Sequence, residues 1–200
     1  SLEVKTYSFA YAKRYSDKAA NAFKKLGIKR GDVVMLVLKQ RPEVWWCITA
    51  LCKIGATCIP ATFQLMKKDI VYRCNAADVK MIVSVDEEEL TRHITESVPE
   101  CPTLKTIAAV GENIPDGFID MRAEIEAADD NFVPEGEQKM SDMMLIYFSS
   151  GTTGMPKMVK HDYYFPLGHI TTAKYWQCVQ NGKIHMTQTD SGWAKFAWGK

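Results

Sequence analysis

The chain alternates between segments with a helical spacing of apolar residues and short, unbroken apolar runs. Residues 8–26 predict a helix, because apolar positions recur every three or four residues and Gly27 follows as a helix stop. Those positions are Phe9, Ala12, Ala19, Phe23 and Leu26. A strand is predicted over 32–38, and Pro42 then opens a second helix, which Gly55 ends.

The alternation continues along the chain. Strands are predicted over 57–60, 80–85 and 104–110, and helices over 67–77 and 87–97. Strands that alternate with helices favour a largely parallel sheet covered by helices on both faces. We therefore predict an α/β fold that is layered α/β/α around a largely parallel sheet.

The composition changes between residues 127 and 140, where acidic and polar residues replace apolar ones. This segment is interpreted as a loop or a soft subdomain boundary. The apolar run over 143–148 then predicts a strand that is buried on both faces. A further helix is expected over 164–177.

A loop rich in hydroxyls and glycines follows the strand at 143–148 directly. Its sequence is Ser149-Ser150-Gly151-Thr152-Thr153-Gly154-Met155-Pro156-Lys157. Glycines let the backbone adopt positive φ and approach an anion, while hydroxyls and amides donate hydrogen bonds and the lysine adds a positive charge. This combination predicts a phosphate-binding loop.

The better-known phosphate motifs do not fit this loop. Counting from Gly151, a Walker loop requires glycine at position 156 and a hydroxyl residue after the lysine, but Pro156 stands there and no Ser or Thr follows Lys157. No G-x-G-x-x-G occurs in the chain. A P-loop NTPase is therefore disfavoured. A plain flexible turn is also disfavoured, because such turns rarely gather so many phosphate-binding groups after a buried strand.

The loop resembles the signature loop of the adenylate-forming superfamily, which includes acyl-CoA synthetases, aryl-CoA ligases, luciferases and peptide synthetase adenylation domains. Upstream segments at 31–34, 42–46, 53–56 and 60–61 resemble that family in the expected order. Asp190-Ser191-Gly192-Trp193 resembles the D-x-G-W element of the acetyl- and medium-chain acyl-CoA synthetase branch. The resemblance covers nearly the whole chain and is weakest over 86–140.

The resemblance implies the N-terminal part of an AMP-forming acyl-CoA synthetase. Such an enzyme activates a short- or medium-chain carboxylic acid with ATP, and coenzyme A then accepts the acyl group. Residues 1–200 are interpreted as an incomplete N-terminal (AMP-binding) domain, the partial large domain of such an enzyme, without the C-terminal domain. The family's adenosine, ribose and catalytic lysine contacts have no match here. No catalytic residue is therefore expected in the chain, which alone is expected to be inactive.

The resemblance also assigns site residues. ATP phosphates are expected at Ser149, Ser150, Gly151, Thr152, Thr153, Gly154 and Lys157. Mg²⁺ is expected to enter with ATP rather than on a protein site, with Thr152 the one hydroxyl considered for contact. Gly192 and Trp193 are expected at the acyl pocket, where a large flat side chain limits chain length. The alternative for Trp193 is core packing. Lys195 stands where acetate-specific members of the family have a small hydroxylated residue. The identity of the carboxylic acid substrate therefore stays undetermined.

Charge and composition limit the partners and the compartment. With 25 basic and 24 acidic residues and no basic stripe, the chain is not expected to bind nucleic acid. Its longest apolar run, 33–38, is too short to span a bilayer, and residues 1–5 do not resemble a signal peptide. The six cysteines lack zinc spacing and are expected to be reduced, buried thiols. A cytoplasmic location is predicted.

Other chemically suggestive residues are interpreted as structural. The four histidines, at 93, 161, 169 and 185, are expected to lie far apart and to bind no metal. The acidic run 87–89 is expected in the first turn of a helix, and one indole of Trp45-Trp46 in the core.

Two other functions stay open. One alternative is that the chain belongs to an adenylate-forming ligase for an aryl acid or an amino acid. The other is that it is a non-catalytic nucleotide-binding paralogue. If the chain is an incomplete domain, the apolar surface left exposed is expected to cause self-association.

Overall fold

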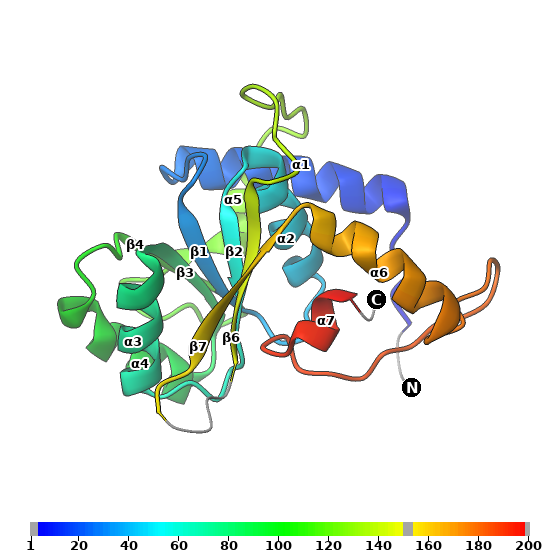
Figure 1. Ribbon diagram of the computed structural model, residues 1–200. Helices are drawn as coiled ribbons and strands as arrows, with labels where there is room; N and C mark the ends of the chain where they lie inside the picture. Colours follow the sequence, from blue (N-terminus) through cyan, green and yellow to red (C-terminus); the bar gives the residue numbers. More distant parts are fainter. Residues whose placement is uncertain (1–3, 150–153, 199–200) are drawn as a thin grey trace.

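The computed structural model describes residues 4–149 and 154–198 (Figure 1). Within these residues, seven strands form one sheet in the order β5-β4-β3-β1-β2-β6-β7. The strands are β1 (Val33–Val37), β2 (Thr57–Pro60), β3 (Val79–Val85), β4 (Thr106–Val110), β5 (Ile119–Asp120), β6 (Met143–Ser149) and β7 (Lys157–Asp162). The helices are α1 (Phe9–Lys25), α2 (Glu43–Ile54), α3 (Lys67–Ala77), α4 (Glu88–Ser97), α5 (Met121–Ala127), α6 (Tyr164–Tyr175) and α7 (Ala194–Trp198), with a 3₁₀ turn η1 (Val98–Glu100).

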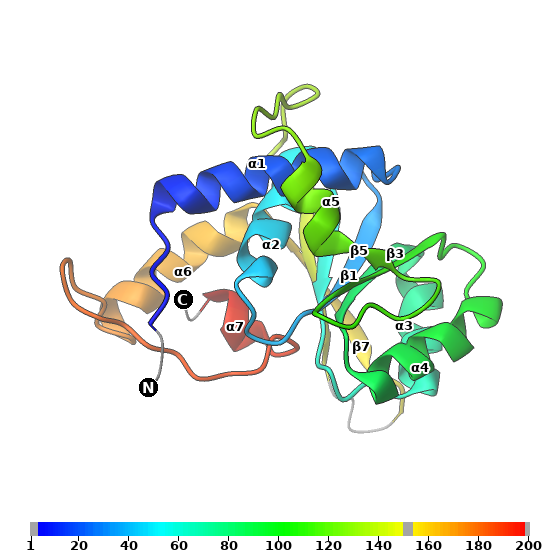
Figure 2. The same cartoon turned by 180° about the vertical axis from the view of Figure 1, so that it is seen from behind.

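The described sheet is parallel except at one edge. Every neighbouring pair from β5 to β6 is parallel, and only β7 runs antiparallel, against β6. Helices cover both faces, with α1, α2 and α5 on one and α3 and α4 on the other (Figures 1 and 2). Phe23, Leu51 and Met121 fill the first interface, and Ile70 and Ile94 fill the second. The predicted layered α/β/α fold is confirmed.

Five elements were not expected from the sequence: β5, α5, β7, α7 and the η1 turn. β5 has only two residues and α5 only seven, so neither shows a readable period. β7 mixes polar and apolar residues over 157–162, because it is an edge strand with mostly exposed or half-buried positions. A strand therefore returns the chain directly from the loop after β6 to α6.

The first turns of α1 differ from the expected buried stripe. Phe9 is 97% exposed, because the buried residues of this helix begin only at Ser16. The preceding turns contact the core through aromatic rings instead. Tyr11 stacks on Tyr15 with ring centroids 4.2 Å apart, and both lie against Trp46. Trp46 is 7% exposed, so the expectation of one core indole in Trp45-Trp46 is confirmed.

One carboxylate ties together the loops after β1, β3 and β4. Asp86 accepts hydrogen bonds from the backbone N–H groups of Glu112 (2.9 Å) and Asn113 (3.2 Å), and from the Arg41 guanidinium (3.0 Å). Although burial acts to raise it, these partners lower the pKa of the Asp86 carboxyl. Gly111 permits the contact, because a Cβ there would lie 1.8 Å from the Asp86 carboxyl carbon.

We expect Gly111→Ala to destabilise the protein by about 1–3 kcal/mol, since the new methyl must displace Asp86 from its partners. Urea unfolding followed by circular dichroism measures the change. Gly168→Ala is the matched control, because Gly168 lies in α6 with open space around it and should gain up to about 1 kcal/mol. Equal stability of Gly111→Ala and the native protein would contradict the steric argument.

Candidate functional site

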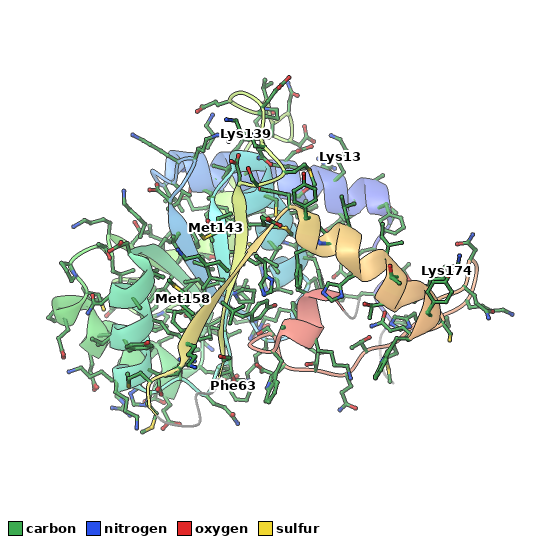
Figure 3. The ribbon with its side chains drawn as sticks, viewed as in Figure 1. Lys13, Phe63, Lys139, Met143, Met158 and Lys174 are labelled. Carbon is green, nitrogen blue, oxygen red and sulfur yellow. The ribbon has the colours of Figure 1, made fainter. Side chains whose placement is uncertain are left out.

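The predicted phosphate loop connects the two strands of the β6–β7 hairpin. β6 pairs with β2 at Cys58 and Leu145, and β7 pairs back on β6 until Lys157 lies opposite Ser149. Figure 3 shows Met158 and Phe63 toward the loop end of the hairpin and Met143 toward its other end. The loop therefore emerges beyond the carboxyl end of β6, the end at which ligands bind in open α/β sheets.

Part of the predicted loop can be placed. Ser150, Gly151, Thr152 and Thr153 lie outside the described residues. The Ser149 hydroxyl donates to the carbonyl oxygen of Lys157 at 3.4 Å. Gly154 has φ of +155°, a backbone conformation that side-chain-bearing residues rarely adopt, and nothing lies within 4 Å of its Cβ position.

Lys157 opens β7 and is exposed. Side chains alternate between the two faces of a strand, so it shares a face with Val159 and His161. Those two residues line a cavity of about 600 Å³. No ion pair among the described residues involves Lys157, so its charge is available to a ligand.

This cavity brings together the two predicted parts of the site. It lies at the carboxyl ends of β2 and β6, between the hairpin and the Asp190–Trp193 turn. Its described walls are Thr62, Gln64, Arg73, Tyr147, Phe148, Ser149, Pro156, Val159, His161, Gly192, Trp193 and Ala194. The end of the predicted phosphate loop and the predicted acyl element, distant in sequence, therefore face one space.

The Asp190–Trp193 turn is fixed against the end of β2. The Ser191 hydroxyl is buried and donates to the Ala61 carbonyl at 3.0 Å, while the Asp190 carboxylate accepts from the Gly192 N–H at 2.7 Å. A Cβ on Gly192 would lie 2.5 Å from the Thr62 backbone nitrogen. Glycine is therefore required for this close approach of two backbones.

Trp193 is not packed in the core of the described chain, the alternative considered for it. It is 69% exposed and forms part of the cavity wall. The core position near it belongs to Phe196, which is fully buried and stacks on Trp45 at a centroid distance of 4.7 Å. Trp193 thus offers a flat apolar surface to the space in front of the hairpin.

Two of the histidines lie close together, contrary to the expectation that all four are far apart. His161 and His169 both contact the Phe165 ring, at centroid distances of 4.2 and 4.6 Å. Burial, followed by the neighbouring His169, lowers the pKa of His161. Within the described ranges, no three His, Cys, Asp or Glu side chains lie close enough to hold a metal ion.

Sequence reasoning missed the contribution of α3. Tyr72 and Arg73 reach the hairpin from this helix, and Arg73 lines the cavity. Neither residue stands out in the sequence, because both lie within an ordinary polar and apolar helical pattern. Only the packing of α3 beside β6 and β7 identifies them.

A second, larger cavity of about 810 Å³ lies between α6 and residues 185–188. Several α6 side chains are strongly exposed, including Ile170 at 62% and Tyr175 at 70%. None of the described α6 residues is buried. This part of the domain therefore presents an apolar surface that the described chain leaves uncovered.

The chain is similar to acyl-coenzyme A synthetases. Mouse (Mus musculus) acyl-coenzyme A synthetase ACSM4, mitochondrial, is 38% identical over 202 residues, which cover 98% of this chain and 34% of that protein. Human (Homo sapiens) acyl-coenzyme A synthetase ACSM5, mitochondrial, is 35% identical with the same coverage of each. This chain therefore spans about a third of the length of these relatives.

A solved structure shares the fold closely. The acyl-CoA synthetase of Brucella canis superposes with a TM-score of 0.85 at 25% identity, covering 98% of this chain and 35% of that one. The acetoacetyl-CoA synthetase of Streptomyces lividans has the same TM-score at 22% identity and 32% coverage of its chain, which supports the fold alone.

The prediction of a cytoplasmic location is wrong. The matching relatives from mouse, rat and human are named as mitochondrial. Balanced charge and short apolar runs describe a folded domain and do not specify its compartment. No helix in the described part of the chain is long and apolar enough to cross a membrane.

The match to a family model covers nearly the whole chain. A model described as AMP-binding enzyme matches residues 2–194. The matched region includes the β6–β7 hairpin and the Asp190–Trp193 turn, so both walls of the 600 Å³ cavity lie inside it. The chain belongs to the AMP-binding enzyme family.

Proposed function

We propose that the chain is the N-terminal part of an AMP-forming acyl-CoA synthetase that activates a short- or medium-chain carboxylic acid. The main observation that supports this proposal is the cavity lined by both the end of the phosphate loop and the Asp190–Trp193 turn. A carboxylate attacks the α-phosphorus of ATP and displaces pyrophosphate. The thiol of coenzyme A then attacks the acyl-adenylate and releases AMP. Similarity to acyl-coenzyme A synthetases supports this reaction.

The hairpin holds the phosphates of ATP. Ser149, Ser150, Thr152 and Thr153 donate through hydroxyl or amide groups, and Gly151 and Gly154 let the backbone approach the anion. Lys157 offsets charge that develops on the departing pyrophosphate. Mg²⁺ accompanies ATP, and the loop hydroxyls fit oxygen coordination, with Thr152 the candidate contact. Catalysis at this stage is mainly positioning and charge neutralisation.

The acid occupies the apolar side of the cavity. Gly192 keeps the turn close to β2, and Trp193 forms a flat wall against which an acyl chain packs. Val159 and Phe148 complete the apolar lining on the hairpin side. The acid is therefore selected by the volume in front of Trp193.

The rest of the protein completes the site. The residues that contact adenosine and ribose, and the family's catalytic lysine, have no match in this chain and are expected in the part of the relatives' length that it does not cover. Residues 127–140 form a subdomain boundary. The complete protein works in mitochondria, as its relatives' names indicate. Its partners are the acid, ATP and coenzyme A. In the isolated chain, the exposed surface of α6 leads to self-association.

Lys157→Ala in the complete protein should slow adenylate formation by roughly 10²- to 10³-fold, the usual cost of losing one preorganised charge donor. Acid-dependent exchange of pyrophosphate into ATP measures this step. Lys160→Ala is the control, because Lys160 lies on the same strand but on its other face. An unchanged exchange rate in Lys157→Ala would remove this lysine from the mechanism, and no exchange in the native protein would refute the proposed function.

Trp193→Gly should shift preference toward longer acids, because the opened space buries extra methylenes worth about 0.8 kcal/mol each. Values of kcat/KM over a series of straight-chain acids measure the shift. The melting temperature should change little, since Trp193 is mostly exposed. Trp176→Gly, another exposed indole, is the control. A flat order of acids in Trp193→Gly would exclude this residue from acid selection.

The isolated 200-residue chain should make no acyl-CoA and should associate with itself as its concentration rises. Sedimentation velocity measures the association. Ile170→Glu should weaken it, because the charge falls within the exposed apolar surface of α6. Val133→Glu is the control, since Val133 is exposed in the segment before β6. A monomer at every concentration, or acyl-CoA formed by the chain alone, would contradict this prediction.

A further inference from the structure

Helix α3 supports both described ends of the phosphate-loop hairpin with two consecutive side chains. The Tyr72 hydroxyl donates to the Pro156 carbonyl at 2.8 Å, where the chain enters β7. The Arg73 guanidinium lies over the Phe148 ring, 5.2 Å from its centroid, where β6 ends. Arg73 is half-buried and forms part of the wall of the 600 Å³ cavity.

Arg73 has no anionic partner among the described residues. Its Nη1 atom is buried and makes no hydrogen bond there, and no described ion pair includes it. Asp69, one turn earlier on α3, contributes an electrostatic attraction, but its carboxylate accepts the Met66 N–H at 3.2 Å in the capping box of the helix. Asp69 therefore attracts Arg73 electrostatically, but it forms no described ion pair or hydrogen bond with it.

The cavity contains no other fixed charge among its described walls. No aspartate or glutamate lines it, and burial lowers the pKa of His161, which favours a neutral ring at pH 7. A guanidinium stays protonated in proteins even when it is partly buried. A buried donor that lacks a hydrogen-bond partner costs free energy. An anion bound in the cavity would supply that partner to the Arg73 guanidinium.

We propose that Arg73 is an anion-binding residue that contacts a phosphate-class ligand, the triphosphate of ATP or the pyrophosphate that leaves it. The planar guanidinium donates in a fork that matches two phosphate oxygens, and it lines the same cavity as the end of the hairpin and the Asp190–Trp193 turn. Stacking on Phe148 holds the guanidinium in place. This inference rests on the proposed function and names a protein group of the phosphate site outside the loop itself.

Isothermal titration calorimetry of inorganic pyrophosphate binding to the complete protein tests this role. Arg73→Gln should weaken binding by about 10- to 100-fold, the range for a lost hydrogen bond to a charged group. Arg73→Lys should recover part of the loss, because it keeps the charge without the fork. Arg92→Gln is the control and should bind normally, since Arg92 is exposed on α4 and pairs with Glu96 at 3.0 Å.

Three results would overturn the role of Arg73. Unchanged pyrophosphate binding in Arg73→Gln would exclude it from the phosphate site. A rise in KM for the acid alone would assign Arg73 to the substrate carboxylate instead. A lowered melting temperature with equal losses for ATP, acid and coenzyme A would reduce it to a structural support of Phe148.

A native protein that binds pyrophosphate through Arg73 but forms no adenylate with any acid would retain this inference and refute the ligase. A native protein that forms adenylate while Arg73→Gln keeps its normal KM for ATP and pyrophosphate would retain the ligase and refute this inference.

Discussion

Strand β2 is the constraint on which the site depends, because it positions both walls of the cavity. On one edge it pairs with β1 and on the other with β6, whose hairpin holds the predicted phosphate loop. Just beyond its carboxyl end, the Ala61 carbonyl accepts the buried Ser191 hydroxyl. Parallel pairing places the ends of neighbouring strands at one edge of the sheet, so one short strand sets the distance between groups far apart in sequence.

The alternation of apolar patterns was sufficient to predict the layered sheet. Buried parallel strands read as unbroken apolar runs, and helices packed on one side show a helical period. Elements that make few contacts with the core could not be predicted in this way. β7 is a mostly exposed edge strand, and α5 is too short for a period. Phe9 fitted the stripe of α1, yet the first turns of that helix extend past the core.

The candidate site was partly readable for a similar reason. Glycines, hydroxyls and a lysine in one continuous segment predict a phosphate loop from the sequence alone. Arg73 can be connected with that loop only once the structure places α3 beside Phe148. The proximity of His161 and His169 likewise depends on how α6 follows β7. The compartment could not be read from the residues that fold the domain, because cellular addresses are encoded in separate targeting segments.

The contact between Gly192 and Thr62 has a consequence for how such a pocket diversifies. Two backbones touch there without an intervening side chain, so the turn cannot move toward β2 and cannot accept a larger residue. The backbone of the turn is therefore fixed in this chain, and only the side chains that project from it can change without moving it. Exchange of the residues at positions 193 and 194 would change the shape of the cavity, while the β6–β7 hairpin on its other side keeps its geometry.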